Sequence, residues 1–138
     1  MLDVNLRGAF LCARAVARPM IRQRDGHIIN LSSLAARRGP AGQSSYAAAK
    51  AGLVGLTQSL AKELGSRNVR VNAIFPGMMP TNMTAKMSAE QLAAFAHANA
   101  LGRINSPDEV ARFIVFLATT QNISGQVFAL DSRIAPWT

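Results

Sequence analysis

The spacing of apolar residues along the chain predicts two long helices in its first half. Residues 3–22 place Val, Leu, Phe and Ala side chains at three- and four-residue steps on more than one face, which is typical of a helix covered on two sides. Residues 44–64 are rich in Ala and carry Leu at the same steps. We expect Ser44 or Ser45 to cap the start of this second helix, and Gly65 to end it in the left-handed conformation.

Two shorter helices are predicted by the residues that open them. Ser88 is followed three residues later by Gln91, the pattern of a capping box, and opens a helix that runs to about Ala100. The run Ser106-Pro107-Asp108-Glu109 is a stronger capping box, with Ser at the N-cap, Pro at the first helical position and Glu at the third. A further helix is therefore expected directly after it.

Short β-branched runs between these helices predict three strands, at residues 27–31, 69–74 and 126–130. Strands separated by helices imply right-handed crossovers and a parallel sheet with helices on both faces. The expected fold class is therefore α/β. A sheet of three strands has at least one bare edge, so we interpret residues 1–138 as a single partial domain.

Composition narrows the class of protein. The chain is 49% hydrophobic, which excludes intrinsic disorder, and no apolar stretch is long enough to span a membrane. A net charge of +8 can mark a nucleic-acid partner, but the Arg residues are scattered and aromatic content is only 6%, so we expect no nucleic-acid binding. The single Cys and the two His residues lack partners at metal-ligand spacing, so no metal site is expected.

The candidate chemistry lies at the start of helix 44–64. Tyr46 and Lys50 are four residues apart, so their side chains share one helix face. A tyrosine beside an ammonium gives up its proton more readily and can exchange it with an alcohol or ketone. Ser33 follows the predicted strand 27–31, where ligands gather in parallel sheets, and could bind a substrate oxygen. Taken alone, the Tyr-x-x-x-Lys spacing also fits an exposed face of an amphipathic helix.

The segments around these residues resemble those of the short-chain dehydrogenases/reductases, and in style the 3-oxoacyl-carrier-protein reductases among them. Residues 26–33 and 46–53 are similar to the core motifs of that family. Segments 3–8, 71–77 and 101–111, and then 124–127, continue the match in the family's order. The resemblance implies that the predicted sheet is the carboxyl-terminal part of a Rossmann-like, doubly wound fold. It also implies a cytoplasmic enzyme that interconverts a small carbonyl compound and a secondary alcohol.

The resemblance implies a catalytic set of four residues: Asn5, Ser33, Tyr46 and Lys50. Tyr46 would give or take the proton, and Lys50 would assist it and hold the nicotinamide ribose. Ser33 would orient the substrate carbonyl. Asn5 would hold a water that links Lys50 to solvent, although an Asn inside a helix also fits a simple internal cap.

The same resemblance implies NAD or NADP as cofactor. The residues expected at its nicotinamide end are Tyr46, Lys50, Pro76, Gly77, Met79 and Thr81. The pair Pro76-Gly77 also fits an ordinary turn. No Gly-rich turn follows a first strand here, so residues for the pyrophosphate and adenosine are missing. We therefore interpret the chain as a truncated or partial reductase and expect the isolated chain to be nearly inactive.

Three further features leave alternatives open. Helices 3–22 and 44–64 resemble the family's dimer interface, so we expect a homo-oligomer, and a non-catalytic interaction module is the alternative function. Arg37-Arg38 could attract an anionic substrate or lie in a solvated loop. Asp131-Ser132-Arg133 replaces the family's Asp-Gly-Gly, and the apolar tail 134–137 is expected at a subunit interface.

Overall fold

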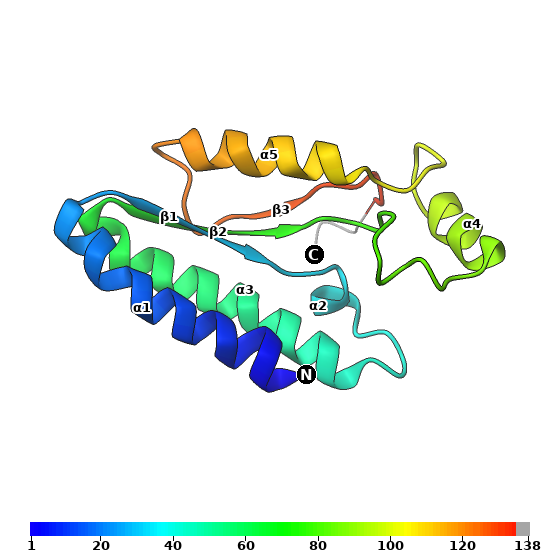
Figure 1. Ribbon diagram of the computed structural model, residues 1–138, viewed down its shortest axis with the longest axis horizontal. Helices are drawn as coiled ribbons and strands as arrows, with labels where there is room; N and C mark the ends of the chain where they lie inside the picture. Colours follow the sequence, from blue (N-terminus) through cyan, green and yellow to red (C-terminus); the bar gives the residue numbers. More distant parts are fainter. Residues whose placement is uncertain (135–138) are drawn as a thin grey trace.

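A three-stranded parallel sheet lies at the centre of the computed structural model, which describes residues 1–134 (Figure 1). Its strands lie side by side in chain order: β1 (Gly26–Leu31), β2 (Val69–Phe75) and β3 (Val127–Ala129). The β1–β2 ladder pairs Leu31 with Ile74, and the β2–β3 ladder pairs Phe75 with Ala129. The predicted parallel sheet is confirmed. Of the tail at 134–137, only Ile134 is among the described residues.

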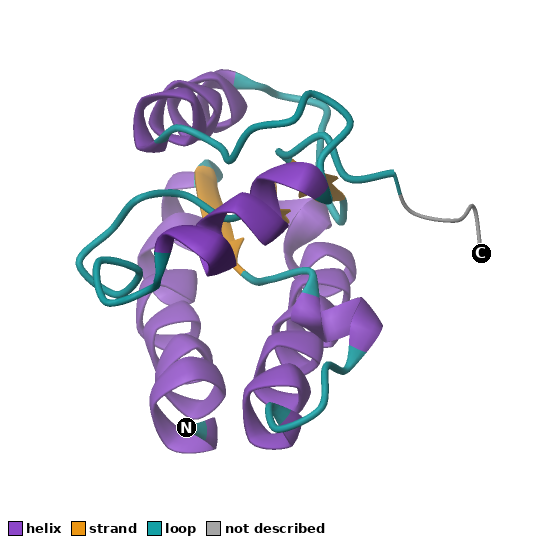
Figure 2. Ribbon diagram, turned by 90° about the vertical axis from the view of Figure 1, so that its right-hand side faces the viewer, coloured by secondary structure: helices purple, strands orange, loops and turns teal. Residues whose placement is uncertain are grey.

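Helices cover both faces of the sheet (Figures 1 and 2). The helices are η1 (Asp3–Arg7), α1 (Gly8–Gln23), α2 (Ala35–Arg38), α3 (Ser44–Leu64), η2 (Gly65–Arg67), α4 (Ala89–His97) and α5 (Pro107–Thr119). Helices α1 and α3 pack on one face around buried Val69 and Val71. Helix α5 packs on the other face, where Val110 and Leu117 meet Ile74. Successive side chains of β2 thus point into the hydrophobic cores on opposite faces of the sheet, and the whole strand is buried.

The helix ends agree with the sequence patterns only in part. Ser88 makes both bonds of a capping box with Gln91, as predicted. Ser106 also caps its helix, but its hydroxyl accepts from the Asp108 amide and its own amide bonds Asn105 Oδ1, so the predicted capping box with Glu109 does not form. Helix α4 ends at His97 rather than Ala100.

The second long helix has the predicted bounds, Ser44–Leu64, but both of its predicted caps are wrong. Gln43 occupies the N-cap of α3 without a side-chain bond, so neither Ser44 nor Ser45 caps it. Gly65 has an ordinary helical φ of −59°, and Asn68 adopts the left-handed conformation instead, at φ +59°. The chain tightens through η2 before it turns, because the bond from Asn68 N to the Gly65 carbonyl closes a 3-10 turn.

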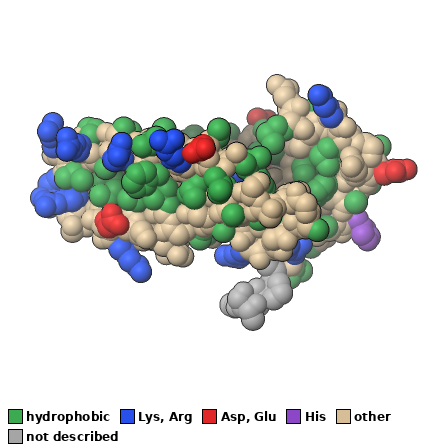
Figure 3. Space-filling view, turned by 90° about the horizontal axis from the view of Figure 1, so that it is seen from below, with side chains coloured by type: hydrophobic (Ala, Val, Ile, Leu, Met, Phe, Trp, Pro, Cys, Tyr) green, Lys and Arg blue, Asp and Glu red, His purple; other side chains and the backbone are tan. Residues whose placement is uncertain are grey.

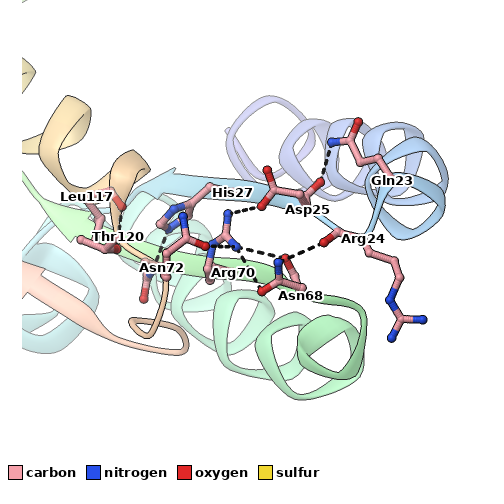
Figure 4. A network of polar contacts seen from close by, with 10 residues as sticks. Gln23, Arg24, Asp25, His27, Asn68, Arg70, Asn72, Leu117 and Thr120 are labelled. Atoms are coloured by element: carbon pink, nitrogen blue, oxygen red, sulfur yellow. Dashed lines mark hydrogen bonds and ion pairs between the residues drawn. The ribbon is translucent and has the colours of Figure 1, made fainter.

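A network of polar side chains joins the amino ends of the strands (Figure 4). Arg70 is only 6% exposed, and its Nη2 lies 2.7 Å from Asp25 Oδ1. Asn72 Nδ2 lies 2.8 Å from both His27 Nε2 and the Ile123 carbonyl oxygen. The network therefore ties β1, β2 and the segment before β3 at the edge opposite the predicted site.

Candidate active site

The first two turns of α3 bring Tyr46 and Lys50 together. Lys50 Nζ lies 5.6 Å from the centroid of the Tyr46 ring, and it donates a hydrogen bond to the Leu31 carbonyl at 2.8 Å. Partial burial lowers the pKa of Lys50, because it disfavours the charged ammonium. The ammonium is thus fixed between the tyrosine ring and the carboxyl end of β1.

Ser33 lies in the turn that directly follows β1. Its hydroxyl oxygen accepts a hydrogen bond from the Ala35 amide at 3.2 Å, while the hydroxyl proton stays available to another acceptor. The neighbouring Ser32 donates to the Lys50 carbonyl at 2.7 Å and its amide donates to the Ile74 carbonyl. Ser32 therefore joins β1, β2 and α3. The sequence alone does not show which of the two adjacent serines has this structural role and which is free to bind a substrate.

Asn5 lies in η1, a single π-helical turn, and does not reach Lys50. Its Nδ2 donates to the Met1 carbonyl at 3.2 Å and lies 3.0 Å from the Met1 sulfur. The next residue, Leu6, packs directly on α3: a Cβ at Gly52 would lie 2.6 Å from its Cδ2. The structure thus brings η1 to the part of α3 that follows Lys50, but the side chain of Asn5 bonds within its own turn.

The turn after β2 forms the second part of the site. Gly77 has φ +80°, and a Cβ there would lie 2.7 Å from Asp131 Cβ, so glycine is required. Farther along, Thr84 Oγ1 donates to the Met79 carbonyl at 3.0 Å and accepts from the Thr81 amide at 2.8 Å. Thr84, which sequence reasoning missed, therefore fixes the two predicted residues Met79 and Thr81 relative to each other.

These two groups of residues lie at the same edge of the sheet. Because Leu31 pairs with Ile74, the turns that carry Ser33 and Pro76 leave neighbouring strands at the same level. Thr81 and Thr84 also line a surface pocket of about 380 Å³ together with Leu92. The arrangement can hold a proton-exchanging tyrosine, an ammonium and a hydroxyl beside a glycine turn at the carboxyl ends of parallel strands, where ligands bind in such folds.

Arg37 belongs to α2 rather than to a loop, and it is held in place. Its guanidinium lies 5.2 Å from the ring centroid of Phe75, the last residue of β2. Neither of the two interpretations of Arg37-Arg38 is decided by this contact. Among residues 1–134, no group of three His, Cys, Asp or Glu side chains could hold a metal ion, and no helix is long and apolar enough to cross a membrane.

Known proteins match this chain over nearly all of its length. A family model described as enoyl-(acyl carrier protein) reductase matches residues 1–132. The 3-oxoacyl-[acyl-carrier-protein] reductase of Synechocystis sp. is 46% identical over 134 residues, which are 95% of this chain and 53% of the relative. The enzyme of the same name from Thermotoga maritima is 43% identical over 136 residues, 97% of this chain and 55% of the relative.

A solved structure agrees with these matches. The crystal structure of 3-hydroxyacyl-CoA dehydrogenase type-2 from Mycobacterium avium aligns with a TM-score of 0.87 at 38% identity, over 98% of this chain and 56% of that one. The chain thus spans about half the length of the relatives it matches. The predicted Rossmann-like α/β class is confirmed, and the chain belongs to the short-chain dehydrogenase/reductase family, where it is similar to the 3-oxoacyl-[acyl-carrier-protein] reductases.

Proposed function

We propose that this chain is the catalytic half of a nicotinamide-dependent reductase that interconverts a carbonyl compound and a secondary alcohol. The observation that carries the proposal is the position of Tyr46 and Lys50 on one face of α3, with Lys50 held at the end of β1 beside the turn of Ser33. Family membership supports the same reaction class.

The proposed proton transfer uses three of these side chains. In the reducing direction, the Tyr46 hydroxyl donates its proton to the substrate oxygen, and in the oxidising direction the phenolate takes it back. The Lys50 ammonium stabilises that phenolate. Ser33 donates its free hydroxyl proton to the same substrate oxygen and so orients the carbonyl. Asn5 takes part only if its side chain leaves Met1 to hold a water beside Lys50.

The residues of the second turn fit the nicotinamide end of NAD or NADP, which supplies or accepts the hydride when bound. Gly77 allows the left-handed conformation of this turn and its close packing against Asp131, and Pro76 stiffens the turn beside it. Met79 and Thr81, fixed by Thr84, would bind the carboxamide side. Lys50 would bind the ribose hydroxyls after its ammonium breaks the hydrogen bond to the Leu31 carbonyl.

The relatives' names suggest a substrate class. Two of these relatives are named for a 3-oxoacyl carrier-protein substrate and the solved structure for a 3-hydroxyacyl-CoA substrate. The 3-oxo group and the 3-hydroxy group are the oxidised and the reduced state of the same β-carbon of an acyl thioester. We therefore propose a 3-oxoacyl thioester as the substrate of the complete enzyme.

A chimeric enzyme tests this proposal. Residues 1–138 would replace the matching part of the Synechocystis reductase, which supplies the rest of the cofactor site, and acetoacetyl-CoA reduction by NADPH would be measured. We expect turnover that falls about 100-fold or more in Tyr46→Phe and stays unchanged in the neighbouring control Ser45→Ala. A chimera that folds and binds NADPH but shows no Tyr46-dependent turnover would contradict the proposal.

A second function is favoured by a specific surface. On the face that α1 shares with α3, η1 and α1 expose large apolar side chains, among them Val4 (79%) and Phe10 (45%), between Lys and Arg residues (Figure 3). Exposed apolar patches of this kind mark protein–protein contacts. We propose that two copies of the chain pair through α1 and α3, whether or not they are catalytic.

A further inference from the structure

Asn105 joins the carboxyl ends of two strands. It lies between α4 and α5, and its Nδ2 donates to the carbonyl oxygens of Pro76 and Leu130, each at 2.7 Å. Its Oδ1 accepts from the Ser106 amide at 2.8 Å. Both amide protons and the amide oxygen are therefore bonded, which is the pattern of a structural hub rather than of a surface residue.

The backbone of Asn105 binds the same turn a second time. Its amide donates to the Met78 carbonyl at 2.7 Å, so Pro76 and Met78, the residues on either side of Gly77, are both bonded to Asn105. A Cβ added at Gly77 would meet Asp131, which is itself paired with Arg133. The turn is thus bonded to Asn105 and packed against Asp131.

We propose that Asn105 is a positioning residue that keeps the turn Pro76–Met78 in the one conformation that receives the nicotinamide. The inference rests on the proposed function, which assigns the nicotinamide to this turn. An asparagine amide offers two N–H donors to two carbonyls, whereas an isosteric carboxylate would turn negative oxygens toward them. Holding the turn before ligand binding avoids the ordering cost of fixing it afterwards.

The wild-type chain alone gives a first test. In ¹⁵N-labelled chain transferred to D₂O, the side-chain amide protons of Asn105 should exchange at least about tenfold more slowly than those of Asn122, which is exposed and lies in the loop before β3. Equal exchange rates would overturn the proposal. This measurement needs no variant, so it stands even if a substitution at Asn105 prevents folding.

A matched pair of variants gives the second test. Asn105→Asp and the control Asn122→Asp make the same chemical change, and the probe is nicotinamide mononucleotide, titrated while the amide signals of residues 77–79 are followed. We expect Asn105→Asp to broaden or split these signals before any ligand is added and to weaken binding of the probe about tenfold. The control should match the wild type.

The possible outcomes separate the two proposals. Sharp, unshifted turn signals and normal probe binding in Asn105→Asp would overturn the role of Asn105 and leave the proposed function intact. Failure of the wild-type chain to bind nicotinamide mononucleotide would instead overturn the assignment of the nicotinamide to this turn, and with it the role of Asn105 toward the cofactor.

Discussion

At the scale of single residues, the candidate site depends on one backbone position more than on any side chain around it. Gly77 combines φ +80° with a neighbour, Asp131 Cβ, that would lie 2.7 Å from an added Cβ. Gly39, at the end of α2, also has a positive φ, +53°, but nothing lies within 4 Å of the place where its Cβ would be. A substitution at Gly39 would therefore add backbone strain alone, whereas one at Gly77 would add both strain and a steric clash.

We expect Gly77→Ala to lower the free energy of unfolding by about 2 kcal/mol or more, because strain and the contact with Asp131 add. The control Gly39→Ala should cost only about 1 kcal/mol, the strain alone. Urea unfolding followed by circular dichroism measures both. Equal losses of unfolding free energy in the two variants would show that Asp131 moves away from the added methyl group at no energetic cost.

The residues of the site differ in how far a sequence predicts them. Tyr46 and Lys50 share a helix face by their spacing alone, and Ser33 is placed by the end of a strand. Asn105 bonds loops that meet only in the folded chain, so no local pattern predicts its role. Thr84 bonds residues three and five positions before it, but no helical or strand period marks that segment. The sequence does not indicate the π-helical turn of Asn5, in which the side chain bonds Met1, and the predicted role of Asn5 stays a prediction.

At the scale of elements, the predicted order of helices and strands is confirmed, and apolar periodicity agrees with burial along α3, α5 and β2. The short elements cannot be predicted from apolar periodicity. Helix α2 spans only four residues, too few to show a period, and it forms where Ser33 bonds the Ala35 amide. The left-handed turn after α3 moves from Gly65 to Asn68 because η2 intervenes.

The polar network at the amino ends of the strands predicts a dependence of stability on pH. Burial lowers the pKa of His27 from 6.5, and the Arg70 guanidinium lowers it further, against weaker opposite effects of the Ala118 carbonyl and Asp25. Asn72 offers an N–H to His27 Nε2 because its oxygen accepts from the Gln126 amide, so this nitrogen must stay unprotonated.

Below about pH 6.5 the unfolded chain therefore binds a proton at His27 that the folded chain resists. The free energy of unfolding should fall as the pH drops below about 6.5, and the fall should end once the pH is below the lowered pKa of the folded state. His27→Gln, which keeps an acceptor without the charge, should flatten this slope, whereas His97→Gln on exposed α4 should not. Parallel slopes in the wild type and His27→Gln would contradict the expectation.

At the scale of the whole molecule, two exposed apolar surfaces compete as the site of self-association. Helix α1 with η1 exposes Val4 and Phe10, and α5 on the opposite face exposes Val115 and Phe116. The first surface is continuous with α3, which packs against both α1 and η1, so a partner could cover two long helices at once (Figure 3). The first surface also exposes Leu11 and Val16, so pairing there would bury more apolar area than pairing through α5.

Matched substitutions decide between these surfaces. We expect Phe10→Asp to convert a dimer into a monomer in sedimentation equilibrium, because a buried, unpaired carboxylate at the centre of the α1–α3 interface costs several kcal/mol. Phe116→Asp introduces the same change at a phenylalanine that is 59% exposed on α5, and it should leave the mass unchanged. The reverse result would place the contact on α5. A wild-type chain that remains monomeric would remove the interaction function and leave the reductase as the surviving proposal.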